Sequence, residues 1–202
     1  MTGAFILIIG IAVILHEVAH GYAASLLGDP TARDQGRLTL NPIPHIDLIG
    51  TIIIPAFLII TNAGILFGWA KPVPYNPYNL RGRFGEALVA AAGPATNIAL
   101  ALLFALLFRL FADASAVPLF SMAVGINLFL AFLNLIPVPP LDGSKIVSAF
   151  LPMQTRLRFE EKVAEVGSNP IFLILVLLGI VFFLAQPLAT LVWFITQRFL
   201  GV

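Results

Sequence analysis

The chain has 202 residues, of which 59% are hydrophobic and 10% are charged, and its formal net charge at pH 7 is +1. Soluble domains are nearer half apolar and a quarter charged, so this composition excludes an ordinary soluble protein and indicates an integral membrane protein. The small net charge gives no sign of nucleic-acid binding, and the absence of cysteine excludes disulfides, thiolate metal sites and cysteine nucleophiles.

A membrane-spanning helix needs about 20 mostly apolar residues. The segments that reach this length without a strong interruption are 3–27, 85–111, 118–136 and 170–196. The first is predicted to be a retained helix rather than a signal peptide, because no basic region precedes it and no small-residue cleavage site follows its apolar core. The four segments predict an all-α, polytopic helical bundle with about four full spans.

The segment 47–69 is long enough to cross but contains the interruptions Gly50, Pro55, Asn62 and Gly64. Before it, the alternating pattern "GRLTLNP" predicts a small membrane-associated strand or hairpin near 36–41. After it, 71–83 is predicted to be a proline-rich surface loop, and 144–168 a surface helix of mixed charge. We expect a single integral-membrane domain over 1–202, with core motifs in 3–143 and the surface helix and last span in 144–202.

The first predicted helix contains the motif "HEVAH", which places His16 and His20 one turn apart on the same helical face. At this spacing two imidazoles can bind one zinc ion, and Glu17 between them can act as a general base on the attacking water. On a soluble helix such a motif can be a chance arrangement on a solvated face. In a membrane helix ionisable residues are costly and indicate a functional site, so the motif favours a metal site.

A catalytic zinc site usually has three protein ligands, and the spacing leaves the third one open. The candidates are His45, Asp29, Asp34, Asp47, Glu86, Asp113, Asp142 and the acidic residues at 160–165. Asp142 follows a predicted span that runs into Pro137, Pro139 and Pro140, and broken backbone at membrane depth is tolerated where it lines a cavity. An Asp-Gly pair is equally typical of a plain turn. His45 is predicted to be a loop histidine hydrogen-bonded to backbone.

Three motifs in the same order resemble the site-2 proteases, which are intramembrane zinc metalloproteases. They are "HEVAH" at 16–20, "AGPATN" at 92–97 and "NLIPVPPLDG" at 134–143, and the run "GDPTARDQGRLTLNPIPHIDLIGTIIIPAFL" is similar to the compact prokaryotic branch of that family. The resemblance implies that His16, His20 and Asp142 hold one zinc ion per chain and that Glu17 is the general base. It further implies that Asn134 stabilises the oxyanion or orients substrate, with Asn97 a weaker candidate for lining the site. The chain differs from regulated members in having no inserted PDZ or CBS domain, so its regulation stays open.

The expected function is therefore zinc-dependent hydrolysis of peptide bonds in or near the transmembrane segments of protein substrates, within a prokaryotic plasma membrane. The alternative is a metal-binding transporter or channel that uses the same side chains to line an ion path. Glu17 distinguishes the two, because transport needs ligands whereas hydrolysis also needs a base. A non-catalytic scaffold would leave the buried charges unexplained. No nucleic-acid partner is expected, and the oligomeric state is left open.

The zinc hypothesis also predicts the topology. If 47–69 crossed the membrane, the first motif and Asp142 would approach opposite faces, whereas a re-entrant segment brings them to the same face. The re-entrant arrangement places most of the basic residues on that face, and only Arg109 and Arg198 on the other. The residues on the shared face are Arg33, Arg37, Lys71, Arg81, Arg83, Lys145, Arg156, Arg158 and Lys162. This asymmetry indicates that the shared face is cytoplasmic, with both termini outside and the zinc nearer the cytoplasm.

Overall fold

The computed structural model describes residues 2–62, 68–168 and 170–201, and within these ranges every regular element is helical. The longer helices are α1 (Thr2–Leu26), α4 (Gly85–Phe111), α5 (Val117–Asn134), α7 (Met153–Ser168) and α8 (Pro170–Leu200). The shorter elements are α2 (Thr31–Asp34), η1 (Ile43–His45), η2 (Leu48–Ile53), α3 (Ile54–Ile60), η3 (Pro77–Asn79), η4 (Ala114–Ala116) and α6 (Asp142–Ser148). The prediction of an all-helical protein is confirmed for the described residues.

Three of the described helices are long and apolar enough to cross a membrane: α1, α4, and α5 with the short turn η4 before it. They correspond to the first three predicted spans. The backbone of the fourth, 170–196, forms the helix α8, but several of its side chains lie outside the described residues. The count of four spans therefore stays a prediction.

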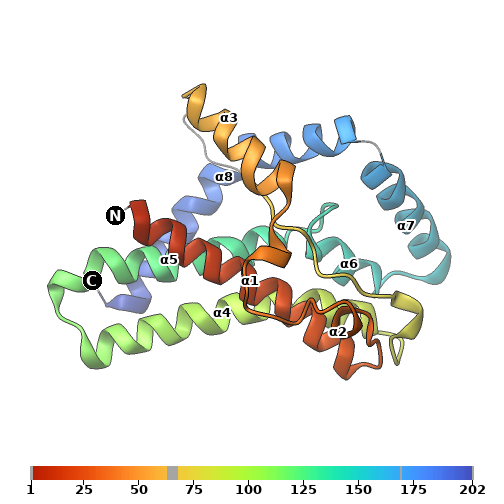
Figure 1. Cartoon of the computed structure of the whole chain (residues 1–202), viewed down its shortest axis with the longest axis horizontal. Coiled ribbons are helices and arrows are strands. Elements are labelled where there is room, and N and C mark those ends of the chain that lie inside the picture. Colours follow the sequence, from red (N-terminus) through yellow and green to blue (C-terminus); the bar gives the residue numbers. More distant parts are fainter. Residues whose placement is uncertain (1, 63–67, 169, 202) are drawn as a thin grey trace.

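Helix α4 packs against both α1 and α5, which also contact each other, and α5 in turn packs against α8 (Figure 1). The buried cluster that joins α4, α5 and α8 consists of Ala101, Ala105, Phe108, Val124, Leu128, Val192 and Leu200. Alanines at such contacts allow helix backbones to approach closely in a membrane protein. Leucines on the outer side of α4, such as Leu102 and Leu106, are about half exposed. This arrangement holds the middle of α4 against the histidine-bearing part of α1.

The two ends of the segment 47–69 lie side by side. The backbone N–H of Trp69 donates to the carbonyl of Gly50 at 3.1 Å, and the Thr51 hydroxyl donates to the Trp69 carbonyl at 2.8 Å. Gly50 has no side chain, and a Cβ there would overlap the Trp69 ring. The apolar helical part, 48–60, is shorter than a crossing requires. The chain thus returns to its starting point, as a re-entrant segment must, although residues 63–67 lie outside the described part.

The strand predicted near 36–41 is absent, and this prediction was wrong. In a strand, Leu38 and Leu40 would face the same side, but Leu38 packs beside Gly21 whereas Leu40 is 63% exposed. The polar side chains of the segment bond locally instead: Thr39 Oγ1 accepts from the N–H of Asn41 at 3.1 Å. Alternation of apolar and polar residues is typical of a strand, but it does not show whether a second strand is available to pair with. Here none is present among the described residues, so the segment stays irregular.

The predicted surface helix 144–168 is divided into α6 and α7. The break covers residues 149–152 and includes Pro152, and proline disfavours helical backbone in the residue before it. The division places Asp142 at the start of a short helix of its own. Helix α6 packs against α4 and carries this carboxylate toward α1.

Candidate metal centre

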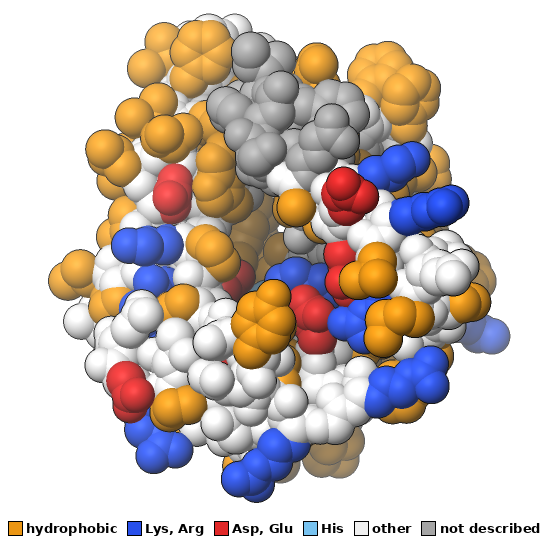
Figure 2. Space-filling model, turned by 90° about the vertical axis from the view of Figure 1, so that its right-hand side faces the viewer, with side chains coloured by type: hydrophobic (Ala, Val, Ile, Leu, Met, Phe, Trp, Pro, Cys, Tyr) orange, Lys and Arg blue, Asp and Glu red, His pale blue; other side chains and the backbone are white. Residues whose placement is uncertain are grey.

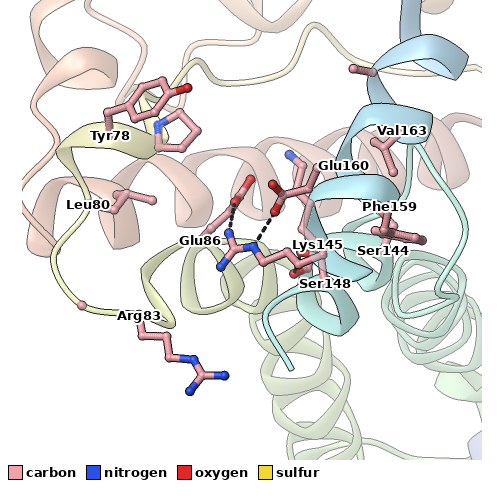
Figure 3. A pocket seen from close by; sticks show the side chains of 14 residues that line it. Tyr78, Leu80, Arg83, Glu86, Ser144, Lys145, Ser148, Phe159, Glu160 and Val163 are labelled. Atoms are coloured by element: carbon pink, nitrogen blue, oxygen red, sulfur yellow. Dashed lines mark hydrogen bonds and ion pairs between the residues drawn. The ribbon is translucent and has the colours of Figure 1, made fainter. Parts of the chain in front are cut away.

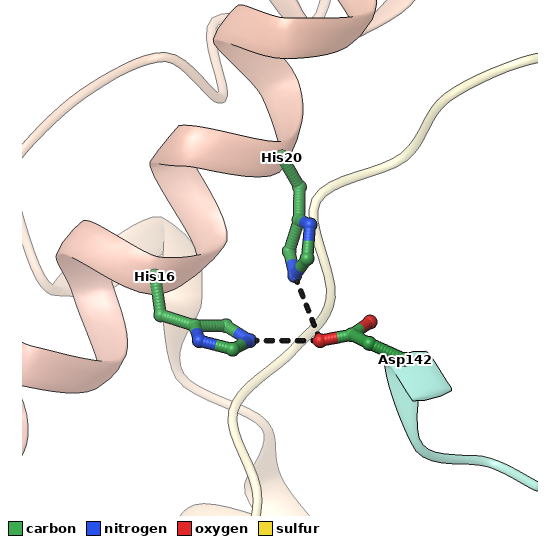
Figure 4. Close-up of side chains that lie close together, drawn as sticks. All are labelled: His16, His20 and Asp142. Atoms are coloured by element: carbon green, nitrogen blue, oxygen red, sulfur yellow. Dashed lines mark ion pairs between the residues drawn. The ribbon is translucent and has the colours of Figure 1, made fainter. Parts of the chain in front are cut away.

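Two helices bring three potential metal ligands to one point. His16 and His20 lie one turn apart on α1, and Asp142 is the first residue of α6. The Oδ2 atom of Asp142 is 3.2 Å from Nε2 of His16 and 3.3 Å from Nε2 of His20 (Figure 4). All three ligand atoms lie within 4.8 Å of one another. Among the candidates that the spacing had left open, Asp142 forms a close group with both histidines in the described part of the chain.

The other ring nitrogen of each histidine already has a partner. Nδ1 of His20 is 2.7 Å from the carbonyl oxygen of Val89 on α4, and a carbonyl can only accept, so Nδ1 carries the hydrogen. Nδ1 of His16 is 2.6 Å from Oδ1 of Asn97 on the same helix. In both rings the lone pair is then left on Nε2, the atom that faces Asp142. Metal-binding histidines are commonly oriented in this way.

The space around these three atoms suits a metal ion. Gly93 of α4 faces the two imidazoles, and a Cβ at this position would lie 2.5 Å from Nε2 of His20 and 2.6 Å from Nε2 of His16. Oδ2 of Asp142 is buried and makes no hydrogen bond. Two neutral imidazoles and one carboxylate are ligands that zinc accepts, as in catalytic sites with three protein ligands. The residues present fit a zinc ion.

Glu17 lies at the same site and is held by the segment that follows the re-entrant region. Its Oε2 accepts a hydrogen bond from the backbone N–H of Val73 at 2.9 Å. Val73 is buried, and its side chain lies beside Gly21 of α1. The carboxylate of Glu17 is therefore oriented by backbone from a distant part of the chain. Nothing in the sequence pattern pointed to Val73, because a backbone donor leaves no residue signature.

These groups surround a small cavity of about 150 Å³. Its lining includes the three potential ligands, Glu17, Tyr75 and two further polar side chains, Asn134 and Lys145. Asn134 is the last residue of α5, and its Nδ2 donates to the carbonyl of Leu130 at 3.0 Å. The structure thus places Asn134 in the cavity, where the resemblance had implied it. Asn97, the weaker candidate, lies instead behind His16, in the middle of α4.

Lys145 is a residue that the sequence reasoning missed, because it reads as part of a charged surface helix. Its ammonium nitrogen lies 5.0 Å from the centre of the Tyr75 ring, which is within reach of a cation–π interaction. Burial alone would lower the pKa of Lys145, but Tyr75, Asp142 and Glu86 outweigh this effect and raise it. Lys145 is therefore a cation at neutral pH, one turn along α6 from Asp142.

Lys145 also lines a second, larger cavity of about 560 Å³ that lies between α6, α7 and the 77–83 segment. Within it, Arg156 of α7 pairs with Glu160 at 2.5 Å and with Glu86 of α4 at 3.4 Å (Figure 3). Figure 2 shows this face of the molecule hollowed, with acidic and basic side chains gathered in the hollow. Lys145 thus lines both the ligand cavity and a more open cavity with charged and apolar side chains in its wall.

Other candidate ligands lie elsewhere. His45 is the last residue of the short helix η1, and its Nε2 lies 2.9 Å from the Thr39 carbonyl. The predicted hydrogen bond to backbone is thus present, but the predicted loop position was wrong. Asp29 is buried at the end of α1, where it accepts hydrogen bonds from the Asn76 N–H at 2.7 Å and from Nδ2 of Asn79 at 2.8 Å. Burial opposes ionisation of Asp29, but these bonds and those from Thr31 outweigh it and lower its pKa. Asp29 anchors the 76–81 segment rather than a metal.

Comparison with known proteins places this arrangement in a family. A "Putative zinc metalloprotease YwhC" from Bacillus subtilis is 40% identical over 172 residues, which cover 80% of this chain and 74% of the relative. The model of Peptidase family M50 matches residues 109–178. This chain belongs to peptidase family M50, the site-2 proteases. The resemblance seen in the three motifs is confirmed.

More distant relatives of this M50 peptidase carry the same description. Rip2 proteins from Mycolicibacterium smegmatis and Mycobacterium tuberculosis are 34% and 30% identical over 165 residues, which cover 77% of this chain and 61% of theirs. The region of the chain that matches the family model contains Asn134 and Asp142 but not the histidines of α1. No solved structure matches the chain significantly.

Proposed function

We propose that this M50 peptidase is a zinc-dependent endopeptidase that hydrolyses peptide bonds in or near membrane-spanning segments of other proteins. The observation that carries the proposal is the ligand cavity, where two imidazoles, one carboxylate and a separate glutamate converge inside an apolar helical bundle. The names of the relatives identify them as zinc metalloproteases, which agrees with this donor set.

In the proposed site, Nε2 of His16, Nε2 of His20 and Oδ2 of Asp142 hold one zinc ion. Zinc bound there supplies Lewis-acid chemistry: it polarises the scissile carbonyl and lowers the pKa of water toward about 7. The hydrogen bonds to Asn97 and Val89 keep both Nε2 atoms available for this role. Gly93 keeps the space in front of them open.

Glu17 is the proposed general base. Its carboxylate takes the proton of the attacking water and then delivers it to the nitrogen of the leaving amine. The hydrogen bond from Val73 leaves the second carboxylate oxygen of Glu17 available for this transfer. A carboxylate between two ligands on the same helix serves hydrolysis but is not required for transport, so this residue favours the protease over the transporter.

Two further groups in the cavity suit the developing negative charge on the carbonyl oxygen. Asn134 uses one amide hydrogen on Leu130 and has a second, which makes it the proposed oxyanion donor. Lys145 contributes a fixed positive charge in the same cavity. Preorganised donors and charges of this kind stabilise an oxyanion more strongly where water is excluded.

The proposed substrates are membrane-spanning helices. The carbonyls of an intact helix are hydrogen-bonded within it, so a substrate must unwind locally before a carbonyl can enter the cavity. Substrates with glycine near the cleaved bond should therefore be cut faster than those with leucine, since glycine lowers helix stability by up to about 1 kcal/mol per residue. The 36–41 segment forms no strand, so an unwound substrate is not proposed to pair with it by strand addition.

The proposed orientation places the ligand cavity near the cytoplasmic face of a prokaryotic plasma membrane, with four crossings. The loop after α1 and the 71–83 segment lie on one side, because Arg81 N–H bonds to the Leu27 carbonyl at 2.8 Å. At the other end of the bundle, Arg109 donates to the carbonyls of Arg198 and Phe199. Because the chain has no cysteine, Gln35→Cys and Tyr78→Cys can be labelled from either side. Both should react from the cytoplasm, and labelling from opposite sides would exclude this topology.

The deciding experiment compares Glu17→Gln with the unaltered protein in liposomes. Glutamine still accepts a hydrogen bond from Val73 but cannot take a proton, so zinc should remain bound while cleavage of a panel of single-span proteins slows by about 10²–10⁴-fold. Glu161→Gln, on the exposed side of α7, is the matched control and should cleave normally. Normal cleavage by Glu17→Gln would remove the proposed base. Zinc flux across the liposomes without cleavage would favour the transporter.

A further inference from the structure

A pair of buried amides lies directly behind the proposed metal site. Asn97 of α4 is 0% exposed and Asn127 of α5 is 1% exposed. Buried amides inside a membrane bundle are costly unless they are hydrogen-bonded. The proposed catalytic chemistry uses neither side chain directly, so the presence of two buried amides at this depth calls for a physical reason.

The donor and acceptor of each hydrogen bond in this group can be assigned, because the group includes backbone carbonyls, which can only accept. Asn127 lies 2.9 Å from the carbonyl of Ala123, and a carbonyl only accepts, so Nδ2 of Asn127 must be the atom that faces it. Oδ1 of Asn127 is then left to accept from Nδ2 of Asn97, at 3.0 Å. Nδ2 of Asn97 also donates to the carbonyl of Ala12 on α1, at a longer 3.3 Å.

These hydrogen bonds determine which atom of Asn97 faces the ring of His16. With Nδ2 of Asn97 engaged, its Oδ1 faces Nδ1 of His16 at 2.6 Å. An acceptor at this place requires a hydrogen on Nδ1, which leaves the lone pair of His16 on Nε2. We propose that Asn127 is a positioning residue for the metal site, which acts through Asn97 to hold His16 in the Nδ1–H tautomer.

The other two histidines differ from His16 in this respect. Nδ1 of His20 is held directly by the Val89 carbonyl, and Nε2 of His45 by the Thr39 carbonyl. An amide can rotate by half a turn and exchange its donor for its acceptor, whereas a carbonyl cannot. His16 alone among the three therefore faces an amide, and its tautomer is linked to α5 through the 3.0 Å bond to Asn127 in addition to the longer 3.3 Å bond from Asn97 to the Ala12 carbonyl.

The proposal rests on the proposed zinc site only in naming Nε2 as the metal-binding atom. Its test reads the tautomer itself, by ¹⁵N NMR of histidine-labelled, metal-free protein at about pH 9, well above the ordinary histidine pKa. The chain has three histidines, so each ring can be resolved. In the unaltered protein, His16 and His20 should carry the hydrogen on Nδ1 and His45 on Nε2.

In Asn127→Leu, which keeps a similar volume, the His16 signals should shift to a mixture of tautomers while His20 and His45 stay unchanged. The shift should be partial, since Ala12 still accepts from Asn97. Zinc affinity, measured by competition with a chelator, should fall about tenfold, the lower end of the effect of removing a group that orients a metal ligand. Asn127→Ala removes the same amide with less volume and should give the same result if leucine is not accommodated.

Asn134→Leu is the matched control for the tautomer. Asn134 bonds to its own helix in the same way as Asn127, through the carbonyl four residues before it. The hydrogen bonds of Asn97 to described residues go to His16, Ala12 and Asn127 and not to Asn134, so His16 should keep its tautomer. Asn97→Leu and the double variant complete a cycle, in which the zinc affinities should be non-additive because Asn127 acts through Asn97. A pure Nδ1–H form of His16 in both Asn127 variants, or additive losses of affinity, would overturn the proposal. Neither readout depends on proteolysis, so failure here is distinguishable from failure of the proposed function.

Discussion

Gly93 of α4 faces the ring of His20 so closely that a methyl group at position 93 would lie 2.5 Å from Nε2. The same methyl group would lie 2.6 Å from Nε2 of His16. These are the two nitrogen atoms proposed to bind zinc. The glycine of the "AGPATN" motif thus has a role at the site itself: it leaves room between α4 and the imidazoles.

Gly93→Ala should therefore reduce zinc occupancy. The added methyl group must displace both rings or occupy the metal position, because real Cβ atoms essentially never approach other atoms so closely. Metal analysis of the purified protein measures this. Gly125→Ala on α5 is the matched control, since a Cβ there meets nothing nearer than 3.8 Å, and it should retain zinc. Equal occupancy in the two variants would show that position 93 does not limit the site.

Replacing any one of the three proposed ligands by alanine should lower zinc occupancy below one ion per chain. His16→Ala, His20→Ala and Asp142→Ala each remove one of the three ligand atoms that lie within 4.8 Å of one another. Asn134→Ala, in the same cavity, should affect occupancy far less, because its amide is proposed to act on substrate. Full zinc retention by Asp142→Ala, measured by atomic emission, would exclude Asp142 as the third ligand.

Val73→Pro should slow cleavage while zinc stays bound. The substitution removes the N–H that donates to Glu17, and the residue already precedes a proline, which restricts it to extended backbone that proline can adopt. Loss of a hydrogen bond to a charged group typically costs about 1.5–3 kcal/mol, so a mispositioned base should slow the reaction about tenfold or more. Val73→Ala keeps the N–H and is the control. If both variants slow cleavage equally, the lost packing of the valine, and not its N–H, is responsible.

Acidification should release the 76–81 segment from the end of α1. The native hydrogen bonds lower the pKa of Asp29, so they stabilise the folded segment above the ordinary aspartate pKa of about 3.9, and this contribution is lost as the pH falls through the lower native value. Hydrogen-exchange protection of the segment should therefore decline below about pH 4. Asp29→Asn should show reduced protection already at neutral pH.

The control for this prediction is Asp113→Asn. Asp113 also has a lowered pKa, owing to hydrogen bonds from Ser115, but it lies in the connection between α4 and α5. Its replacement should leave the 76–81 segment protected at neutral pH. Unchanged protection of that segment in Asp29→Asn would mean that the Asp29 carboxylate does not anchor it.

The sequence allowed the helical class and the first three spans to be predicted, because length and hydropathy alone determine which segments can cross a membrane. It also placed His16, Glu17 and His20 on one turn, since helical spacing is a local property. The proposal of Asp142 as the third ligand needed either the family resemblance or the folded chain, because Asp142 is far from α1 in the sequence. The prediction of a strand near 36–41 was wrong because a strand needs a second strand to pair with, and the alternation of apolar and polar residues does not reveal whether one is present.

Three contributions to the site could not be read from the sequence for a physical reason. Val73 acts through a backbone N–H, which any residue other than proline would provide. Lys145 belongs to a stretch of mixed charge, and only the packing of α6 against α4 brings it beside Tyr75. Asn127 lies in a span that is apolar apart from Ser121, Asn127 and Asn134, and its link to His16 passes through a third helix.

The hydrogen bond from Val73 to Glu17 has a consequence for how the chain is aligned along α1. Val73 is flanked by Pro72 and Pro74, and proline nitrogen carries no hydrogen. If the segment slipped by one residue in either direction, it would present a proline nitrogen to Glu17 and leave the carboxylate without its donor. The nearest alternative donors are two residues away, roughly 7 Å along an extended chain. The Pro-Val-Pro sequence therefore allows only one alignment of this segment along α1. Inserting or deleting one residue between Trp69 and Pro72 should slow cleavage as much as removing the Val73 N–H itself.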